Sequence, residues 1–209
     1  MVELIGPDLK KLAQSQRKRG EFEDAVKTLQ QAIVRAGVEL ADLHGILGGT
    51  RKDQGDLVSA AAEYDEGFRI ESHYGIASSY NALNRLILRI MLVPGSLTDP
   101  DRLRKEERLE FVNVRNELLQ LQAQLERQIE EERASDFWAA GDLLVSAALN
   151  GDIEMATVAV QRFVACSPPK FAYSSYHKTI ASLAQLDTPS RDYLEKVDAL
   201  LAASQEQVR

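Results

Sequence analysis

The side chains of this chain that are best spaced for chemistry are cationic and amide groups on predicted helices. In the first predicted helix they stand at positions i, i+4, i+7 and i+8, which share one side of a helix: Lys10, Gln14, Arg17 and Lys18. Four further groups continue the set later in the chain: Lys52, Asn81, Arg85 and Arg89. Arginine and lysine bind carboxylates and other anions through charge-assisted hydrogen bonds. These eight positions therefore predict a basic surface that captures an acidic peptide, and solvated helix faces that bind nothing are the alternative.

Residue types used in catalysis or metal binding do not group in the sequence. His44, His73 and His177 lack the spacing of metal ligands, and Cys166 has no cysteine or histidine near it in the chain. No G-x-G-x-x-G or G-K-[S/T] phosphate loop is present. We therefore expect no enzyme activity, no metal and no cofactor, and a nucleotide or small-molecule sensor is a further alternative. His44 is interpreted as a residue packed between helices and Cys166 as a small, partly buried thiol.

A short phrase that occurs three times indicates which elements position these side chains. It consists of glycine, an acid, a large apolar residue, two further residues and alanine, and it begins at Gly20, Gly55 and Gly151. Glycine supplies the left-handed turn that ends one helix, and the acid stabilises the start of the next. The first two copies are 35 residues apart. A period of about 34 residues is typical of stacked helix-turn-helix units.

Helical spacing of apolar residues predicts an all-α chain. The predicted helices cover residues 8–19, 21–35, 40–52, 57–70, 76–92, 100–134, 136–149, 153–166 and 173–186, and a last helix follows Thr188 and Pro189. Gly37 is predicted to end the second helix. Helix 136–149 is apolar nearly all round, which predicts burial on both sides. The last helix has a single apolar stripe of Leu194, Val197 and Leu201, which suits a helix that covers the open end of a solenoid.

The predicted helix 100–134 is the longest. Asp99 followed by Pro100 is typical of a helix start, and an unbroken helix of this length would span roughly 50 Å. Its apolar stripe has spacings close to a heptad: Phe111, Val114, Leu118, Leu121 and Leu125. One interpretation is an extended second helix that lies on its neighbours. The alternative is a coiled-coil seam that joins two copies of the chain into a homodimer.

The repeat positions resemble those of the tetratricopeptide-repeat superfamily, whose unit reads W-x2-L-G-x2-Y, then A-x3-F, then P. The second unit carries Leu47-Gly48, Ala60 and Tyr64, with His44 and Arg51 in the Trp and Tyr places; the last carries Ala156, Phe163 and Pro168. A narrower resemblance, to the TRAF-binding tetratricopeptide region of stress-activated kinase kinase kinases and bacterial signalling proteins, depends on residues 79–84, Trp138, Pro168-Pro169 and Ser174-Ser175. It implies a regulatory scaffold.

The superfamily resemblance implies a right-handed α-α superhelix with one extended helix and C-terminal capping helices. The implied repeat domain covers residues 6–170 in units 6–39, 40–74, 76–134 and 136–169, and the capping helices cover 171–206. In such solenoids the first helix of each unit lines the concave face. The eight positions named at the outset would then form a basic concave groove for a protein or peptide partner.

Composition limits the partners and the location. The formal net charge is −7, which disfavours binding to nucleic acid or to an anionic membrane. A lone cysteine fits a reducing compartment, and the first residues do not read as a signal peptide. The sequence therefore predicts a cytoplasmic interaction protein that binds neither nucleic acid nor membrane.

Overall fold

The computed structural model describes residues 6–34 and 40–207, and the chain divides after Leu88 into two compact units. The first unit contains α1 (Gly6–Lys18), α2 (Phe22–Val34), α3 (Leu40–Asp53), α4 (Leu57–Tyr74) and the start of α5 (Tyr80–Leu92). The second contains the end of α5, the short 3-10 helix η1 (Pro94–Leu97), α6 (Pro100–Arg104), α7 (Val114–Glu131), α8 (Phe137–Asn150), α9 (Ile153–Ala165), α10 (Lys170–Ala184) and α11 (Arg191–Gln207). The all-α prediction is confirmed. The predicted helix end at Gly37 and most of the segment examined for a signal peptide lie outside the described residues.

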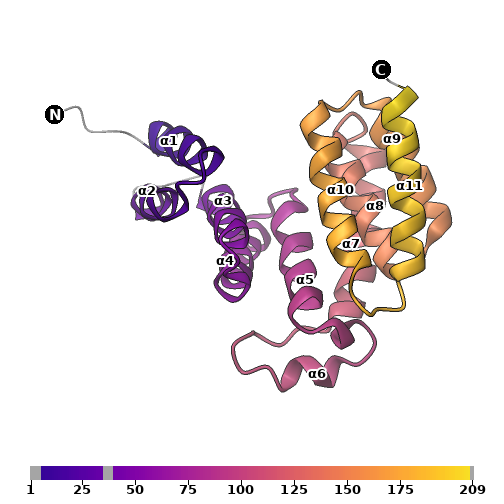
Figure 1. Cartoon of the computed structure of the whole chain (residues 1–209), viewed down its shortest axis with the longest axis horizontal. Coiled ribbons are helices and arrows are strands. Elements are labelled where there is room, and N and C mark those ends of the chain that lie inside the picture. Colours follow the sequence, from indigo (N-terminus) through magenta and orange to yellow (C-terminus); the bar gives the residue numbers. More distant parts are fainter. Residues whose placement is uncertain (1–5, 35–39, 208–209) are drawn as a thin grey trace. The chain divides into compact units, whose positions relative to one another are not determined.

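Consecutive helices pack as hairpins. The pairs are α1 with α2, α3 with α4, α8 with α9 and α10 with α11, seen in Figure 1 from indigo at α1 to yellow at α11. Gly20, Gly55 and Gly151 stand at three of the turns with φ values of 77°, 85° and 80°. These left-handed angles strain any residue with a Cβ, so the repeated phrase marks the turns as predicted. The division of the chain into four repeat units stays a prediction.

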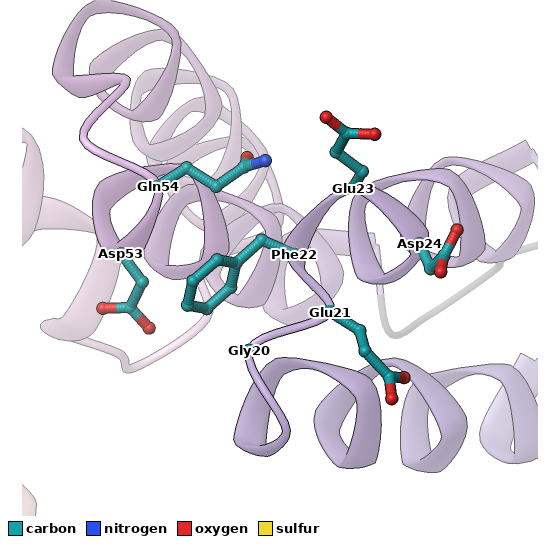
Figure 2. Close-up of a pocket in the computed structure, with 7 residues that line it drawn as sticks. All are labelled: Gly20, Glu21, Phe22, Glu23, Asp24, Asp53 and Gln54. Atoms are coloured by element: carbon teal, nitrogen blue, oxygen red, sulfur yellow. The ribbon is translucent and has the colours of Figure 1, made fainter.

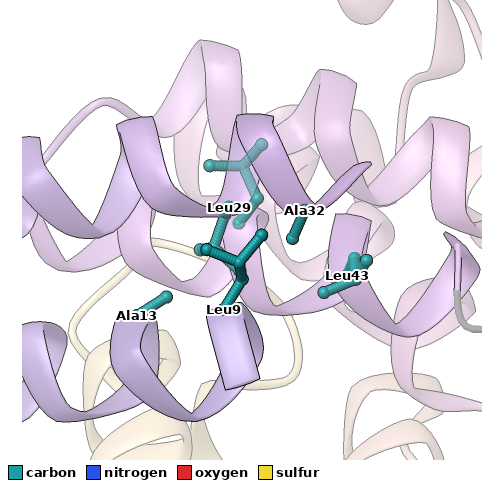
Figure 3. Packing of buried hydrophobic residues seen from close by; sticks show 6 residues of the cluster. Leu9, Ala13, Leu29, Ala32 and Leu43 are labelled. Carbon is teal, nitrogen blue, oxygen red and sulfur yellow. The ribbon is translucent and has the colours of Figure 1, made fainter. Parts of the chain in front are cut away.

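The first unit has a continuous apolar core that joins its first three helices. Figure 3 shows the core from close by, with side chains that come from α1, α2 and α3: Leu9, Ala13, Leu29, Ala32 and Leu43. Leu47 completes the cluster one turn further along α3. The helices form because these apolar residues recur on one side of each, and burying that side stabilises the hairpins against each other.

Helix α8 is the centre of the second unit. All its residues from Ala139 to Leu149 are buried, as its nearly uniform apolar sequence predicts. It packs against α7, α9, α10 and α11. The stripe of α11 is also as predicted, since Leu194, Val197 and Leu201 are buried where this helix contacts α8 and α9.

The segment predicted as one helix over 100–134 is divided. Helix α6 ends at Arg104, and α7 begins at Val114. Between them a run of charged residues from Arg104 to Arg108 offers no apolar side to bury, so a continuous helix gains little there. Asn113 then caps α7, because its side chain accepts a hydrogen bond of 3.1 Å from the Asn116 amide.

The apolar stripe of α7 is covered by the chain itself. Leu118, Leu121 and Leu125 are buried, and α7 packs against α8. The interpretation of α7 as a helix lying on its neighbours therefore describes the structure, and these leucines are not available as a seam between two copies. Within residues 6–34 and 40–207, none of the helices combines the length and apolar composition needed to span a bilayer.

Candidate functional site

The candidate site begins with three glycines of α3, which bring side chains from three other helices close to the backbone of α3. A Cβ added at Gly49 would lie 3.0 Å from Arg17 Nη1 of α1. One at Gly48 would lie 3.0 Å from the Tyr64 ring of α4, and one at Gly45 would lie 3.0 Å from the Tyr80 ring of α5. We call the part of α3 formed by Gly45, Gly48 and Gly49 the glycine surface. It brings a guanidinium and two phenol rings into one cluster.

Arg17 is the first cation of this cluster, and it is only partly neutralised. Its Nε donates a 2.7 Å hydrogen bond to Asp53 Oδ2, and its side chain is 32% exposed. Burial works to lower the pKa of the guanidinium, but the hydrogen bond and charge of Asp53 prevail and raise it. The two Nη groups lie against Gly49 and donate no hydrogen bond to any residue that the structure describes. They can therefore donate to an anion from outside.

Lys52 is the second cation, and it makes no ion pair with any described carboxylate. It is half-buried near the end of α3. Burial lowers the pKa of its ammonium group, the charge of Asp53 opposes this, and the charge of Arg17 adds to it. A partly desolvated cation beside a second cation is unfavourable unless an anion joins them. Lys52 is therefore the clearest sign of a binding site in the first unit.

Two tyrosines complete the cluster. The Tyr64 and Tyr80 hydroxyls are 3.3 Å apart, and their rings meet edge to face at 5.7 Å. Burial, followed by the neighbouring Tyr80, raises the pKa of Tyr64 well above its usual value, so its phenol stays protonated. Tyr80 is 41% exposed, so part of this residue is accessible from solvent.

The other predicted residues of α1 flank this cluster. Gln14 and Lys18 are exposed. Lys10 forms an ion pair with Asp42 of α3, so its charge is largely compensated. The structure therefore brings Arg17 and Lys52 together and leaves Lys10, Gln14 and Lys18 at the margin.

The predicted residues of α5 lie in the interior. Asn81 is buried, and its Nδ2 donates to Glu71 Oε1 at 2.7 Å and to the Ala41 carbonyl at 3.2 Å. Arg85 is buried with Asp65 at 3.6 Å and lies 3.9 Å above the Phe68 ring. A spacing of four selects one side of a helix, but it does not say whether that side faces solvent. Here it faces the protein.

Arg89, the last predicted residue, belongs to the second unit. It is fully buried, and its Nε and Nη2 donate to the Glu110 carbonyl at 3.2 and 3.0 Å. Its role in the structure is to hold the segment between α6 and α7.

Sequence reasoning missed an acidic pocket at the first turn. Figure 2 shows this pocket of about 540 Å³ between the start of α2 and the end of α3, lined by Gly20, Glu21, Phe22, Glu23, Asp24, Asp53 and Gln54. The repeated Gly-acid phrase was the available signal, since it places carboxylates at such turns. The pocket is unsuited to an acidic ligand. No group of three or more histidines, cysteines or acids that could hold a metal ion occurs among the described residues.

His44 and Cys166, which the sequence presents as structural residues, lie outside this cluster. His44 Nδ1 lies 2.9 Å from Glu63 Oε2, and Arg51 Nε donates to the other oxygen of that carboxylate at 3.2 Å. His44 is therefore packed between α3 and α4, as interpreted. Cys166 is half-buried, and burial, with the charge of Asp136, raises the pKa of its thiol. A raised pKa lowers the reactive thiolate fraction.

The residues that match the tetratricopeptide consensus are buried between the paired helices, as such a repeat requires. Leu47, Ala60 and Tyr64 are buried where α3 and α4 pack, and Gly48 admits the Tyr64 ring. In the last hairpin Ala156 and Phe163 are fully buried. The fold is a tetratricopeptide-like helical repeat. The narrower resemblance to the TRAF-binding region stays a prediction.

Comparison with known proteins found similar solved structures, of which two are described here. No family model matches the chain, and no curated protein matches it. The crystal structure of BtubC (BKLC) from P. vanneervenii is 17% identical with a TM-score of 0.47, over 96% of this chain and 78% of that one. A putative kinesin light chain with nearly identical TPR-like repeats from Podosopora anserina is 14% identical with a TM-score of 0.43, over 96% and 95%. The helix pairs, the turns and the consensus positions therefore define the fold.

Proposed function

We propose that the chain is a non-catalytic interaction module, of cytoplasmic location, that captures an acidic segment of a partner protein on its first unit. The binding surface is the cluster of Arg17, Lys52 and Tyr80 at the glycine surface. The observation that supports it best is Lys52, a half-buried ammonium without an ion-pair partner in the described chain. A carboxylate placed between Lys52 and the Nη groups of Arg17 would compensate both charges.

The charges of the cluster favour a carboxylate over a more highly charged anion. Asp53 already neutralises part of Arg17, so the three groups together carry about one positive charge. A carboxylate with a single charge matches this value, and a dianion would be repelled by Asp53. The N–H groups of Arg17 supply direction, and the exposed ring of Tyr80 can pack against the peptide. Lys18 and Gln14 would contact the flanking part of the partner.

A labelled oligo-glutamate peptide tests this function by fluorescence anisotropy with the full chain. We expect Lys52→Gln to weaken binding about tenfold, which corresponds to about 1.4 kcal/mol. The matched control is Lys27→Gln, which removes the same charge from an exposed position on α2. Oligo-glutamine of the same length, which lacks the carboxylates, should not bind. Equal loss in both lysine variants, or no loss in Lys52→Gln, would refute the assignment.

Self-assembly through α7 is less well supported than peptide capture. The leucines that a seam would use, Leu118 and Leu125, are fully buried in the second unit. A nucleotide sensor lacks specific support, since the sequence has no phosphate-loop motif and the described residues contain no group that could hold a metal ion. ATP added to the oligo-glutamate titration tests this rival, since a sensor would lose the peptide at low ATP concentration.

A further inference from the structure

Helix α10 of the second unit has an outward side with an unusual composition for an acidic protein. Its exposed residues fall within about 160° of one another around the helix: Lys170, Phe171, Ser174, Ser175, His177, Lys178 and Ser182. We call this set the α10 face. The helix contains no aspartate or glutamate, although the whole chain has a net charge of −7. One carboxylate reaches this face from α11, since Asp198 Oδ1 lies 2.6 Å from His177 Nδ1. The two lysines still leave the α10 face locally basic and, apart from one phenylalanine, it is polar.

An exposed aromatic pair stands at the start of the α10 face. Phe171 is 63% exposed and Trp138 of α8 is 38% exposed, and their ring centroids are 6.0 Å apart. Large apolar side chains left in contact with water at one spot mark binding surfaces more often than single exposed ones do. Tryptophan and other aromatic rings are also common energetic centres of protein interfaces.

Tyr176, a buried residue of α10, holds the aromatic pair in place. Tyr176 packs 5.9 Å from the Trp138 ring, and its hydroxyl lies 3.0 Å from the Trp138 carbonyl and 2.9 Å from Asp142 Oδ1. Gly141 admits this ring, since a Cβ there would lie 2.1 Å from Tyr176. The pair is thus a preorganised surface, which limits the entropy lost when a partner binds.

The charges on the α10 face point to the chemistry of the occupant. Lys170 and Lys178 are exposed, and neither makes an ion pair with a described carboxylate. They are eight residues apart, which corresponds to about 12 Å along the helix. An extended peptide covers this distance in about four residues at roughly 3.3 Å each. Carboxylates four residues apart, with an apolar side chain between them, would meet both lysines and the aromatic pair.

We propose that the α10 face docks an extended acidic segment of a partner protein, with an apolar side chain on Phe171 and Trp138 and carboxylates at Lys170 and Lys178. This site lies entirely within the second unit and does not depend on the cluster at Arg17 and Lys52. Aromatic and lysine side chains also suit a membrane interface. The net charge of the chain and the three serines of the face favour a peptide over an anionic bilayer.

The probe is a labelled synthetic peptide with a central leucine flanked by serines and then by glutamates four residues apart, titrated into the full chain. We expect Phe171→Ser, and the pair Lys170→Glu with Lys178→Glu, each to weaken binding at least tenfold. The controls are Leu200→Ser, which changes an exposed apolar residue on α11, and Lys105→Glu, which changes an exposed lysine; both variants should bind like the parent chain. Because the glutamates of this peptide can also bind at Lys52, the titrations are repeated in chains that carry Lys52→Gln. There the α10 face should still bind the peptide, and Phe171→Ser should still weaken that binding at least tenfold, which separates this site from the first.

Two results would overturn the proposal. One is unchanged affinity in Phe171→Ser and in the lysine pair, with circular dichroism showing that both variants fold. The other is sedimentation of the chain with vesicles of phosphatidylserine and phosphatidylcholine that is lost in Phe171→Ser, because the α10 face would then be a membrane contact. Absence of the chain from the vesicle pellet supports the peptide.

Discussion

Lys52 illustrates how a residue proposed to bind a partner can reduce the stability of the free protein. Its pKa is lowered in the fold, chiefly by burial. A lysine whose folded pKa lies below its unfolded value destabilises the fold while both states are protonated, and the effect disappears as the pH rises from the folded pKa to the unfolded one near 10.4. At neutral pH the unfavourable contribution is fully present.

We therefore expect Lys52→Met to raise the melting temperature slightly at pH 7 while it weakens the binding of oligo-glutamate. The gain in melting temperature should shrink as the pH approaches 10, because the parent lysine then loses its charge in the fold. Differential scanning calorimetry at several pH values measures this. A lower melting temperature at pH 7 would show that the ammonium of Lys52 has a stabilising contact.

Arg89 is the contrasting case of a cation used inside the protein. Its guanidinium is fully buried and holds the Glu110 carbonyl. Arg89→Ala would leave a cavity and an unpaired carbonyl, so we expect a loss of about 3 kcal/mol in the free energy of unfolding. Urea denaturation measures the loss, and exposed Arg115→Ala should stay within about 0.5 kcal/mol of the parent. Equal stability of the two variants would refute the anchoring role.

At the scale of the helix, two neighbouring leucines of α7 distinguish a helix that packs inside the protein from one that joins two copies. Leu118 is fully buried, whereas its neighbour Leu119 is 47% exposed. A glutamate at Leu118 must lose its hydration or disrupt the contact with α8.

Leu118→Glu should therefore unfold or strongly destabilise the second unit, and Leu119→Glu should leave thermal stability almost unchanged. Thermal denaturation followed by circular dichroism, with sedimentation velocity on the same samples, distinguishes the outcomes. A folded Leu118→Glu monomer derived from a dimeric parent would restore the seam interpretation.

The helices also show which sequence signals were sufficient. The glycine-acid phrase predicted the turns at Gly20, Gly55 and Gly151, because a left-handed turn and a free helix start each restrict the residue strongly. The burial of α8 was also predictable from local sequence, because apolar residues surround this helix on nearly all sides. The break between Arg104 and Val114 was harder to predict, since a capping proline marks where a helix starts but not where it stops. The sequence around 105–108 lacks an apolar side, and this was the overlooked signal.

The candidate site was predictable only in part. Arg17 and Lys52 were named from charge and spacing, and the structure places them together. Arg85 and Arg89 have the same i, i+4 pattern, but they lie inside because Asp65 and the Glu110 carbonyl pair with them from distant parts of the chain. Such contacts leave no local trace in the sequence. The exposed pair of Phe171 and Trp138 likewise depends on how α8 and α10 pack.

The whole molecule is an acidic protein with two basic surfaces, one in each unit. Each surface contains lysine without a described ion-pair partner, Lys52 in the first unit and Lys170 and Lys178 in the second. Electrostatic capture at exposed or half-exposed sites weakens as salt screens the charges. We expect the affinity for oligo-glutamate to fall as sodium chloride rises from about 50 to 500 mM. Isothermal titration calorimetry measures this, and an affinity that does not change with salt would contradict electrostatic capture.

The most direct test of capture at the first unit is to follow the Lys52 ammonium group in the full chain by NMR during titration with oligo-glutamate. A carboxylate that binds between Lys52 and Arg17 must stabilise the protonated amine, so the account predicts that the pKa of Lys52 rises at saturating peptide while the signals of Lys27 stay in place. A Lys52 pKa that is the same with and without saturating peptide would contradict the account.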